Sequence, residues 1–181
     1  MTGSVYWITG LSGAGKSTIA SILTKRLRAA GRAALQFDGD VLRAILQRES
    51  THSAADRQEL ALSYARLCHE VAGQGIDVVC ATVSMFHSVR RWNRENLPAY
   101  REIYLRVPMS ELERRDPKGI YASFRRDDMK NVVGLDLPAE LPDSADLVID
   151  NYSEVSAAAA ADVIWAKLVA NTLSPPGVLE R

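Results

Sequence analysis

A glycine-rich stretch near the start of the chain combines residue types that bind phosphate. It reads GLSGAGKST over positions 10–18 and matches the pattern G-x-x-x-x-G-K-[ST]. Glycines let backbone N–H groups approach an anion, and the helix expected to follow points its positive end at the same place. We expect Lys16 to reach the β- and γ-phosphates and Ser17 to offer its hydroxyl to Mg²⁺. The sequence therefore predicts an ATP site formed by Gly10, Leu11, Ser12, Gly13, Ala14, Gly15, Lys16, Ser17 and Thr18.

Three classes of protein use such a phosphate-binding loop (P-loop), and other motifs separate them. A GTPase switch carries an N-K-x-D guanine-reading motif, which is missing here, so we interpret the D-x-x-G at 116–119 as a coincidence. A motor or transport ATPase has an acidic residue ending its Walker-B strand, whereas the candidate strand here ends in ATVSMF at 81–86. Asp38-Gly39-Asp40 ends another expected strand, where carboxylates face the ligand crevice of a parallel sheet. The pattern favours a small-molecule kinase.

The elements that position these residues alternate between strands and helices. β-Branched and aromatic runs predict strands at 4–9, 33–37, 76–83, 102–107 and 146–149, with the apolar run 76–83 in the centre of the sheet. Apolar spacing predicts helices at 17–30, 60–73 and about 155–173. This alternation predicts an α/β fold of the P-loop NTPase type, with a doubly wound, parallel five-stranded sheet.

The chain is expected to form one kinase domain over residues 1–174, followed by a flexible tail at 175–181. A stretch rich in charge, glycine and proline separates the fourth and fifth strands. Insertions of this kind in compact domains are usually functional, so we expect a mobile lid at about 115–142. The segment HSVRRWNREN (87–96) looks helical, and either presents Arg90 and Arg94 to an anionic ligand or forms a solvated basic helix with Trp92 on the core.

Composition excludes several classes of function. The 181 residues carry a formal net charge of zero, so no overall field attracts nucleic acid or an anionic membrane. The two cysteines, Cys68 and Cys80, lie outside any C-x-x-C spacing and are typical of free thiols in a reducing compartment. The sequence begins without a secretory leader, and no apolar run is long enough to span a membrane. We expect a cytoplasmic protein with a small-molecule acceptor and no nucleic acid or membrane partner.

The chain resembles the adenylylsulfate (APS) kinase family over residues 3 to about 150. The most specific piece is RDPKGIY; the other matching pieces are GLSGAGKST, FDGDVLR (37–43), SAADRQE (53–59), ATVSMF, KNVVGLDLPAELP (130–142) and DLVIDN (146–151). Enzymes of this family move the γ-phosphate of ATP to the 3′-hydroxyl of APS. The resemblance implies the same activity, with ATP and Mg²⁺ bound, in a protein that forms a homodimer.

The resemblance also implies roles for single residues. Asp38 and Asp40 would organise Mg²⁺ and orient the accepting hydroxyl, with Ser17 and Asp38 as metal ligands. Ser84 falls on the serine described in the family as a phosphoserine intermediate, although direct in-line transfer is physically simpler. The catalytic set would be Lys16, Asp38, Asp40 and Ser84, and Arg115 of the lid would contact ATP. The acceptor set would be Asp40, Arg43, His52, Arg57, Ser84, Met85, Phe86, Lys118, Lys130 and Val132.

Departures from the family pattern lie on the acceptor side. His52 and Val132 stand where two family aromatics sandwich the acceptor's adenine, and stacking a base on an aromatic ring contributes ~1–3 kcal/mol. The other departures are Val41, Leu60, Leu62, Ser63 and His87. A second acceptor therefore stays open, namely the cytidine diphosphoramidate used by related kinases of the same fold. A non-catalytic ATP-binding regulator is the alternative from another class.

Overall fold

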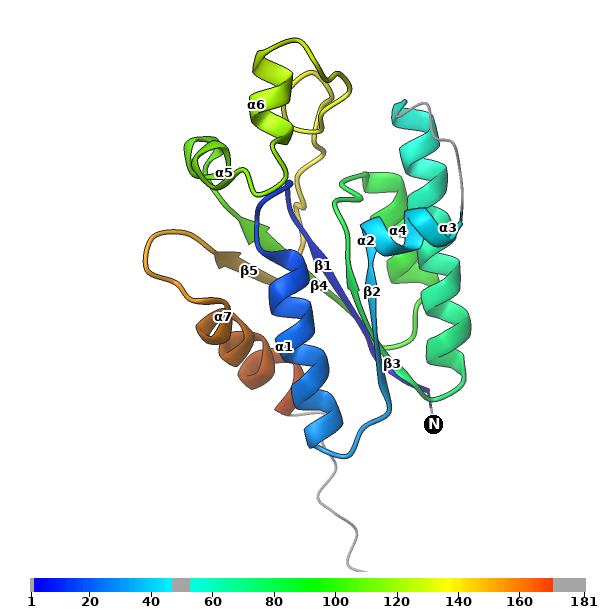
Figure 1. Ribbon diagram of the computed structural model, residues 1–181. Coiled ribbons are helices and arrows are strands. Elements are labelled where there is room, and N and C mark those ends of the chain that lie inside the picture. The colour runs from blue at the N-terminus through cyan, green and yellow to red at the C-terminus, as the bar shows by residue number, and fades with distance from the viewer. Residues whose placement is uncertain (1, 47–52, 171–181) are drawn as a thin grey trace, which may run out of the picture.

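A computed structural model describes residues 2–46 and 53–170 of the chain. Five parallel strands form one sheet in the order β2-β3-β1-β4-β5, with helices on both faces (Figure 1). The strands are β1 (Val5–Thr9), β2 (Ala34–Asp38), β3 (Asp77–Ala81), β4 (Tyr100–Arg106) and β5 (Leu147–Asp150). The predicted doubly wound α/β fold of the P-loop NTPase type is confirmed.

The prediction that the apolar run 76–83 is the central strand was wrong. The middle position belongs to β1, and β3 lies beside it, between β1 and β2. All five residues of both strands are buried. Apolarity therefore marks both as interior strands but does not order them within the sheet.

The helices follow a strand or another helix, and the helix predicted at 60–73 begins earlier than expected. They are α1 (Lys16–Ala29), α2 (Gly39–Ile45), α3 (Ala54–Gly73), α4 (His87–Asn96), α5 (Met109–Arg115), α6 (Ile120–Arg125) and α7 (Ala157–Ile164), followed by the π-helical turn η1 (Trp165–Val169). Helix α3 begins at 54 rather than 60, because the Ser53 hydroxyl caps it by accepting from the Asp56 N–H at 3.2 Å. The predicted tail 175–181 lies outside the described residues.

The core has two halves, one on each face of the sheet. Helices α1 and α7 cover one face of the sheet, and α3 and α4 cover the other (Figure 1). Along β1, Tyr6 and Ile8 pack with α1 and α7, whereas Val5 and Trp7 pack with α3 and α4. This follows from the alternation of side chains along a strand. None of the described helices has the length and apolarity that a membrane span requires.

The expected lid region is folded against the phosphate-binding loop. It includes the end of α5, all of α6 and an isolated bridge between Val133 and Leu137. The Tyr121 hydroxyl donates to the Ser12 carbonyl at 2.9 Å, which ties α6 to the loop. The Asp116 carboxylate accepts from the Tyr121 and Ala122 N–H groups, so the D-x-x-G sequence serves as a helix cap.

Candidate active site

The glycine-rich loop connects β1 to α1 at the carboxyl edge of the sheet. Gly15 precedes α1 with a φ of 90°, a conformation that favours glycine. The half-buried Lys16 curls back over the loop, and its Nζ donates to the Leu11 carbonyl at 2.8 Å. Burial under the loop, followed by the nearby charge of Lys118, lowers the pKa of Lys16 to about 8.

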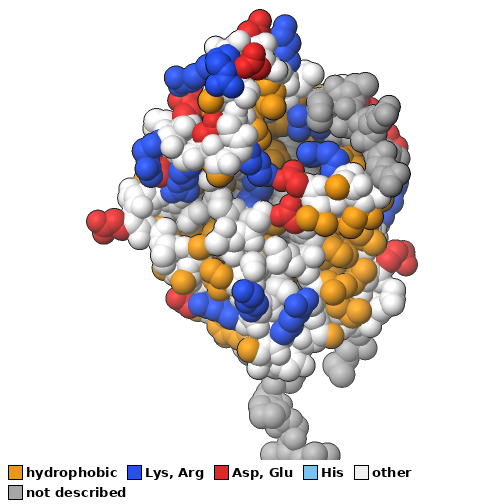
Figure 2. Space-filling model, in the orientation of Figure 1, with side chains coloured by type: hydrophobic (Ala, Val, Ile, Leu, Met, Phe, Trp, Pro, Cys, Tyr) orange, Lys and Arg blue, Asp and Glu red, His pale blue; other side chains and the backbone are white. Residues whose placement is uncertain are grey.

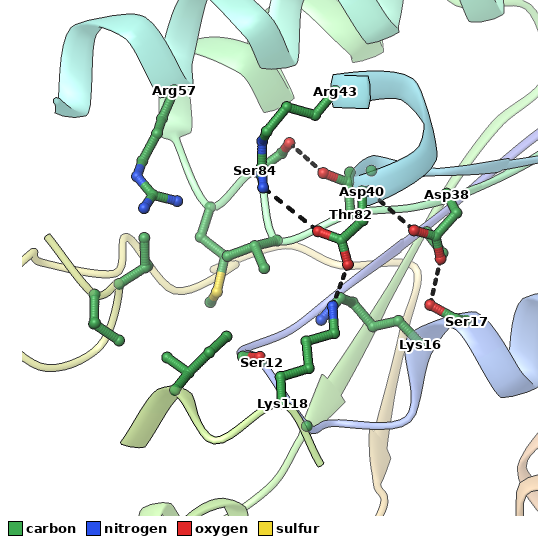
Figure 3. A pocket seen from close by; sticks show the side chains of 18 of the residues that line it. Ser12, Lys16, Ser17, Asp38, Asp40, Arg43, Arg57, Thr82, Ser84 and Lys118 are labelled. Carbon is green, nitrogen blue, oxygen red and sulfur yellow. Dashed lines mark hydrogen bonds and ion pairs between the residues drawn. The ribbon is translucent and has the colours of Figure 1, made fainter. Parts of the chain in front are cut away.

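The Asp38-Gly39-Asp40 sequence lies opposite this loop, where β2 ends and α2 begins. The Ser17 hydroxyl donates to one oxygen of Asp38, and the other oxygen accepts from the Asp40 N–H at 2.9 Å (Figure 3). Asp40 in turn pairs with Lys118 from the lid and with Arg43 at 3.4 Å. Partial burial raises the pKa of Asp40, but the hydrogen bond and charge of Lys118, together with the charges of Arg43 and Lys16, hold that pKa below its usual value.

A cavity of about 440 Å³ runs between the loop, α2, α3, the end of β3 and the lid. Figure 2 shows the hollow between the lid and the α2–α3 side of the molecule, with basic and acidic side chains at its edge. Its lining residues include five cations and two carboxylates, an excess of three positive charges in a chain with no net charge. These charged residues are Lys16, Arg43, Arg57, Lys118, Lys130, Asp38 and Asp40.

Arg43 and Arg57 lie close enough to oppose each other's charge. Burial, followed by the charge of Arg43, lowers the pKa of Arg57. The Arg57 guanidinium also donates to the Asn131 carbonyl at 2.9 Å, which links α3 to the lid. Two guanidinium groups beside one cavity are stabilised by an anion between them, so this end of the cavity is suited to an anionic ligand.

The walls beyond these arginines are apolar. Val132 is 6% exposed, Met85 is 1% exposed, and Phe86 also lines the cavity. Ser84 lies at the base, where its hydroxyl shares a hydrogen bond of 2.7 Å with the Thr82 hydroxyl. The structure thus brings together every described member of the expected acceptor set; His52 lies outside the described residues.

Not every expected ATP residue lines the cavity. Six of them do and three do not: Ser12, Gly13, Gly15, Lys16, Ser17 and Thr18 line the cavity, whereas Gly10, Leu11 and Ala14 are not among its lining residues. A Cβ on Gly10 would lie 2.7 Å from the Leu105 carbonyl, so this position requires glycine. Arg115 does not line the cavity either, because its Nε pairs with Glu111 at 2.7 Å.

Arg90 and Arg94 of α4 do not line this cavity, and Arg90 contacts the end of the lid region instead. Arg90, 5% exposed, pairs with buried Glu102 at 3.7 Å and donates to the Glu140 carbonyl at 2.7 Å. Arg94 pairs with Glu102 at 3.3 Å and with Asp146 at 3.2 Å. Trp92 packs against the half of the core that contains Val5 and Trp7 of β1. The expected packing of Trp92 on the core is confirmed, but Arg90 is buried in an ion pair instead of solvated.

Three residues contact the site but were not predicted from the sequence. The Tyr64 hydroxyl, on α3, donates to the Gly39 carbonyl at 3.0 Å and so fixes the turn between the two aspartates. Thr82 lies under the same turn, 3.1 Å from where a Gly39 Cβ would be. Asn151 donates to the Ala14 carbonyl at 2.8 Å from behind the loop. Thr82 and Asn151 belong to matched sequence pieces, which was the only signal for them.

The residues present suit a magnesium ion bound together with phosphate. The described chain has no cluster of three or more His, Cys, Asp or Glu side chains that could chelate a metal alone. Mg²⁺ commonly takes one or two protein oxygens and completes its shell with phosphate oxygens and water. The hydroxyl of Ser17 beside the carboxylate of Asp38 supplies such a pair.

Comparisons with known proteins agree with this geometry. The family model for adenylylsulphate kinase matches residues 2–150. An adenylyl-sulfate kinase of Paraburkholderia xenovorans is 42% identical over 149 residues (82% of this chain, 83% of the relative). The cytidine diphosphoramidate kinase of Campylobacter jejuni is 40% identical over 150 residues (81% and 85%).

Larger relatives and a solved structure extend the comparison. The bifunctional enzyme NodQ of Azospirillum brasilense is 37% identical over 163 residues, and the match spans 26% of its length. A Mycobacterium tuberculosis APS kinase, solved with AMPPNP and APS, superposes with a TM-score of 0.85 at 30% identity. That match covers 92% of this chain and 98% of the other.

Proposed function

Since this chain belongs to the adenylylsulphate kinase family and is an ATP-dependent phosphotransferase, we propose that its acceptor is the 3′-hydroxyl of APS. The observation that carries this proposal is the positive excess of the cavity between the loop and the lid. ATP would occupy the loop end, and the anionic acceptor would lie between Arg43 and Arg57. The two ligands would then meet at Asp40, which pairs with both Arg43 and Lys118.

The transfer itself requires little covalent chemistry from the protein. The acceptor oxygen forms a bond to the γ-phosphorus while the bond from that phosphorus to the β,γ-bridging oxygen breaks, and ADP leaves. Asp40 accepts the hydroxyl proton, because it is the carboxylate that pairs with Arg43 at the expected acceptor end. Lys16 and Lys118 stabilise charge on the transferring group. Mg²⁺, held by Ser17 and Asp38, would supply further neutralisation of the phosphates.

Ser84 has no necessary part in this in-line transfer. Its hydroxyl is engaged by Thr82 and is largely buried. We expect Ser84→Ala to retain activity within about tenfold of the unmodified enzyme, the loss of one neutral hydrogen bond. The measurement is the initial rate of ADP formation with acceptor present. A loss of several orders of magnitude, with radiolabel from ATP trapped on the wild-type protein, would establish a phosphoserine step.

Cytidine diphosphoramidate is the second candidate acceptor. The observation in its favour is the aliphatic side chain of buried Val132, which offers no ring for stacking a purine. A smaller pyrimidine base depends less on such stacking. The 40% identity to the Campylobacter jejuni enzyme also supports this candidate.

An acceptor panel separates these possibilities. Purified protein with Mg-ATP is given APS, cytidine-diphosphate compounds or plain nucleosides, and ADP release is followed. Turnover with micromolar APS supports the first proposal, and turnover only with the cytidine compound supports the second. ADP release at the same rate with and without every acceptor would contradict both proposed acceptors and indicate an ATPase that transfers phosphate only to water. Binding of ATP without any ADP release would indicate a regulator.

We also propose that the protein acts as a cytoplasmic homodimer. Apolar side chains gather near the β2 edge of the sheet, on the right of Figure 2. Val41 and Ile45 of α2 are 56% and 67% exposed, and Leu35 of β2 is 38% exposed. Light scattering during size exclusion should report twice the chain mass. Ile45→Lys should yield monomer, whereas a monomeric wild-type protein would contradict the proposal.

A further inference from the structure

Asn151 lies directly behind the phosphate-binding loop, and the proposed reaction gives it no role. It follows β5 and is 5% exposed. Its backbone N–H donates to the Arg106 carbonyl at 3.1 Å, which fixes its main chain to β4. Its side-chain Nδ2 donates to the Ala14 carbonyl at 2.8 Å. A rigid sheet edge therefore holds one particular carbonyl of the loop.

The Ala14 carbonyl shares a peptide plane with the Gly15 N–H. The described chain contains no cis peptide, so in this unit the C=O and N–H bonds point in opposite directions. Because Asn151 holds the carbonyl behind the loop, the Gly15 N–H points to the front, where Gly15 lines the cavity. That N–H has no hydrogen-bond partner within the described part of the chain. It is available to a phosphate oxygen.

Two further observations show that this contact is closely fitted. A Cβ on Gly15 would lie 2.8 Å from Asn151 Nδ2, so the amide can approach the loop only because position 15 is glycine. The Asn151 Oδ1 is buried and accepts no hydrogen bond from the described residues. Turning the amide over would place this oxygen against the Ala14 carbonyl oxygen. The unpaired oxygen is thus a cost of keeping the donor on Ala14.

We propose that Asn151 is a positioning residue that locks the Ala14–Gly15 peptide with its N–H directed at the nucleotide phosphates. A flipped peptide would present a carbonyl oxygen to the phosphates and remove one donor. The proposal rests on the ATP-dependent transfer described above. It concerns the nucleotide half of the site alone and is independent of which acceptor is used.

Titration calorimetry with Mg-ADP tests the proposal without any acceptor. Asn151→Ala should weaken ADP binding about 10- to 100-fold, the range expected for one hydrogen bond to a charged group. Asn151→Asp should weaken it at least as much, because two oxygens would then face each other. In steady-state assays the KM for ATP should rise while the KM for the acceptor stays constant.

Asn93→Ala is the matched control. Asn93 lies on α4, is fully buried and also has an Oδ1 without a partner among the described residues. This variant should bind Mg-ADP as the wild type does, even if its melting temperature falls. If Asn151→Asp does not fold, Asn151→Ser serves as the second variant and should retain more affinity than Asn151→Ala.

Two results would overturn the proposal. The first is wild-type ADP affinity in Asn151→Ala, and the second is an equal loss of affinity in Asn151→Ala and Asn93→Ala. If the wild-type protein binds ADP but phosphorylates none of the acceptors, the proposed function fails while the ADP titrations still decide the role of Asn151.

Discussion

The ammonium group of Lys16 lies half-buried beneath the loop, where it donates to the Leu11 carbonyl and meets the charge of Lys118. Burial and this like charge both disfavour its protonated form in the protein without nucleotide. A bound phosphate reverses the balance, because an adjacent anion favours the protonated amine. Nucleotide binding is therefore coupled to the protonation of this single residue.

Lys16 should make ATP binding dependent on pH. Its pKa is about 8 without nucleotide, so below that pH it is already protonated and ready to bind phosphate. Above it, binding must take up a proton, and affinity should fall by about tenfold per pH unit. Calorimetry in buffers of different ionisation enthalpy should detect the proton uptake. Lys16→Ala should abolish phosphate transfer to any acceptor and remove the proton uptake. Proton uptake that persists in the variant would mean that another group takes up the proton.

Site residues that belong to a local sequence motif could be predicted, whereas residues that contact segments distant in the sequence could not. Lys16 and Ser17 follow from one continuous motif, and Asp38 and Asp40 from their place after a strand. Tyr64 and Asn151 depend on contacts between segments far apart in the chain, 25 and 137 positions from their partners. Arg115 was assigned from the resemblance, and its pairing with Glu111 became visible only with the helix formed.

The short helices in and beside the lid region help to position the site, but they could not be predicted from their sequences. Helices α5 and α6 have seven and six residues, too few for an apolar period to be recognised. Lys118 lies between them and reaches across the cavity to Asp40 (Figure 3). This pair is about half exposed on both sides, so it contributes little stability and can separate when phosphate enters.

Removing the lid lysine should shift the acid limb of the pH–rate profile. Lys118 helps to lower the pKa of Asp40, and Asp40 must be ionised to accept the hydroxyl proton. Activity is therefore present above the pKa of Asp40 and lost as pH falls through it. Lys118→Ala should raise that pKa and move the limb of kcat/KM to higher pH. Lys167→Ala, an exposed lysine on η1, is the control; an unmoved limb in Lys118→Ala would contradict the role of Asp40 as the base.

The buried ion pairs of α4 should matter for stability more than for chemistry. Arg90 joins Glu102 of β4 to the carbonyl of Glu140 at the lid base. Arg90→Met leaves Glu102 buried with one partner fewer, a change expected to cost about 3–5 kcal/mol. Thermal unfolding should report the loss. Arg106→Ala breaks the exposed pair with Asp150 and should leave the melting temperature nearly unchanged. Equal effects of the two variants would show that burial of the α4 pair is unimportant.

The phosphate-binding loop is where several parts of the molecule meet. It continues β1 into α1, packs on β4 through Gly10, receives a hydrogen bond from Asn151 after β5, and accepts another from Tyr121 of α6. The alternating pattern of strands and helices sufficed to predict the sheet that carries this loop. The apolar character of a strand did not indicate which strand is central, because β1 and β3 are both fully buried.

A ligand bound at this junction should stabilise the whole described fold rather than one part of it. A ligand at 100 times its Kd adds about 2.7 kcal/mol to the free energy of unfolding. For a chain of this size each kcal/mol raises the melting temperature by roughly 2–4 °C, so Mg-ADP should raise it by about 5–11 °C in a single transition. Scanning calorimetry measures both the shift and the number of transitions. Lys16→Ala with Mg-ADP, and the wild type with Mg²⁺ alone, should show little shift. Two unfolding transitions, of which only one shifts with nucleotide, would contradict this expectation. They would mean that the lid unfolds separately from the sheet, because the lid would then lose its contacts with the loop while the ligand-bound part stays folded.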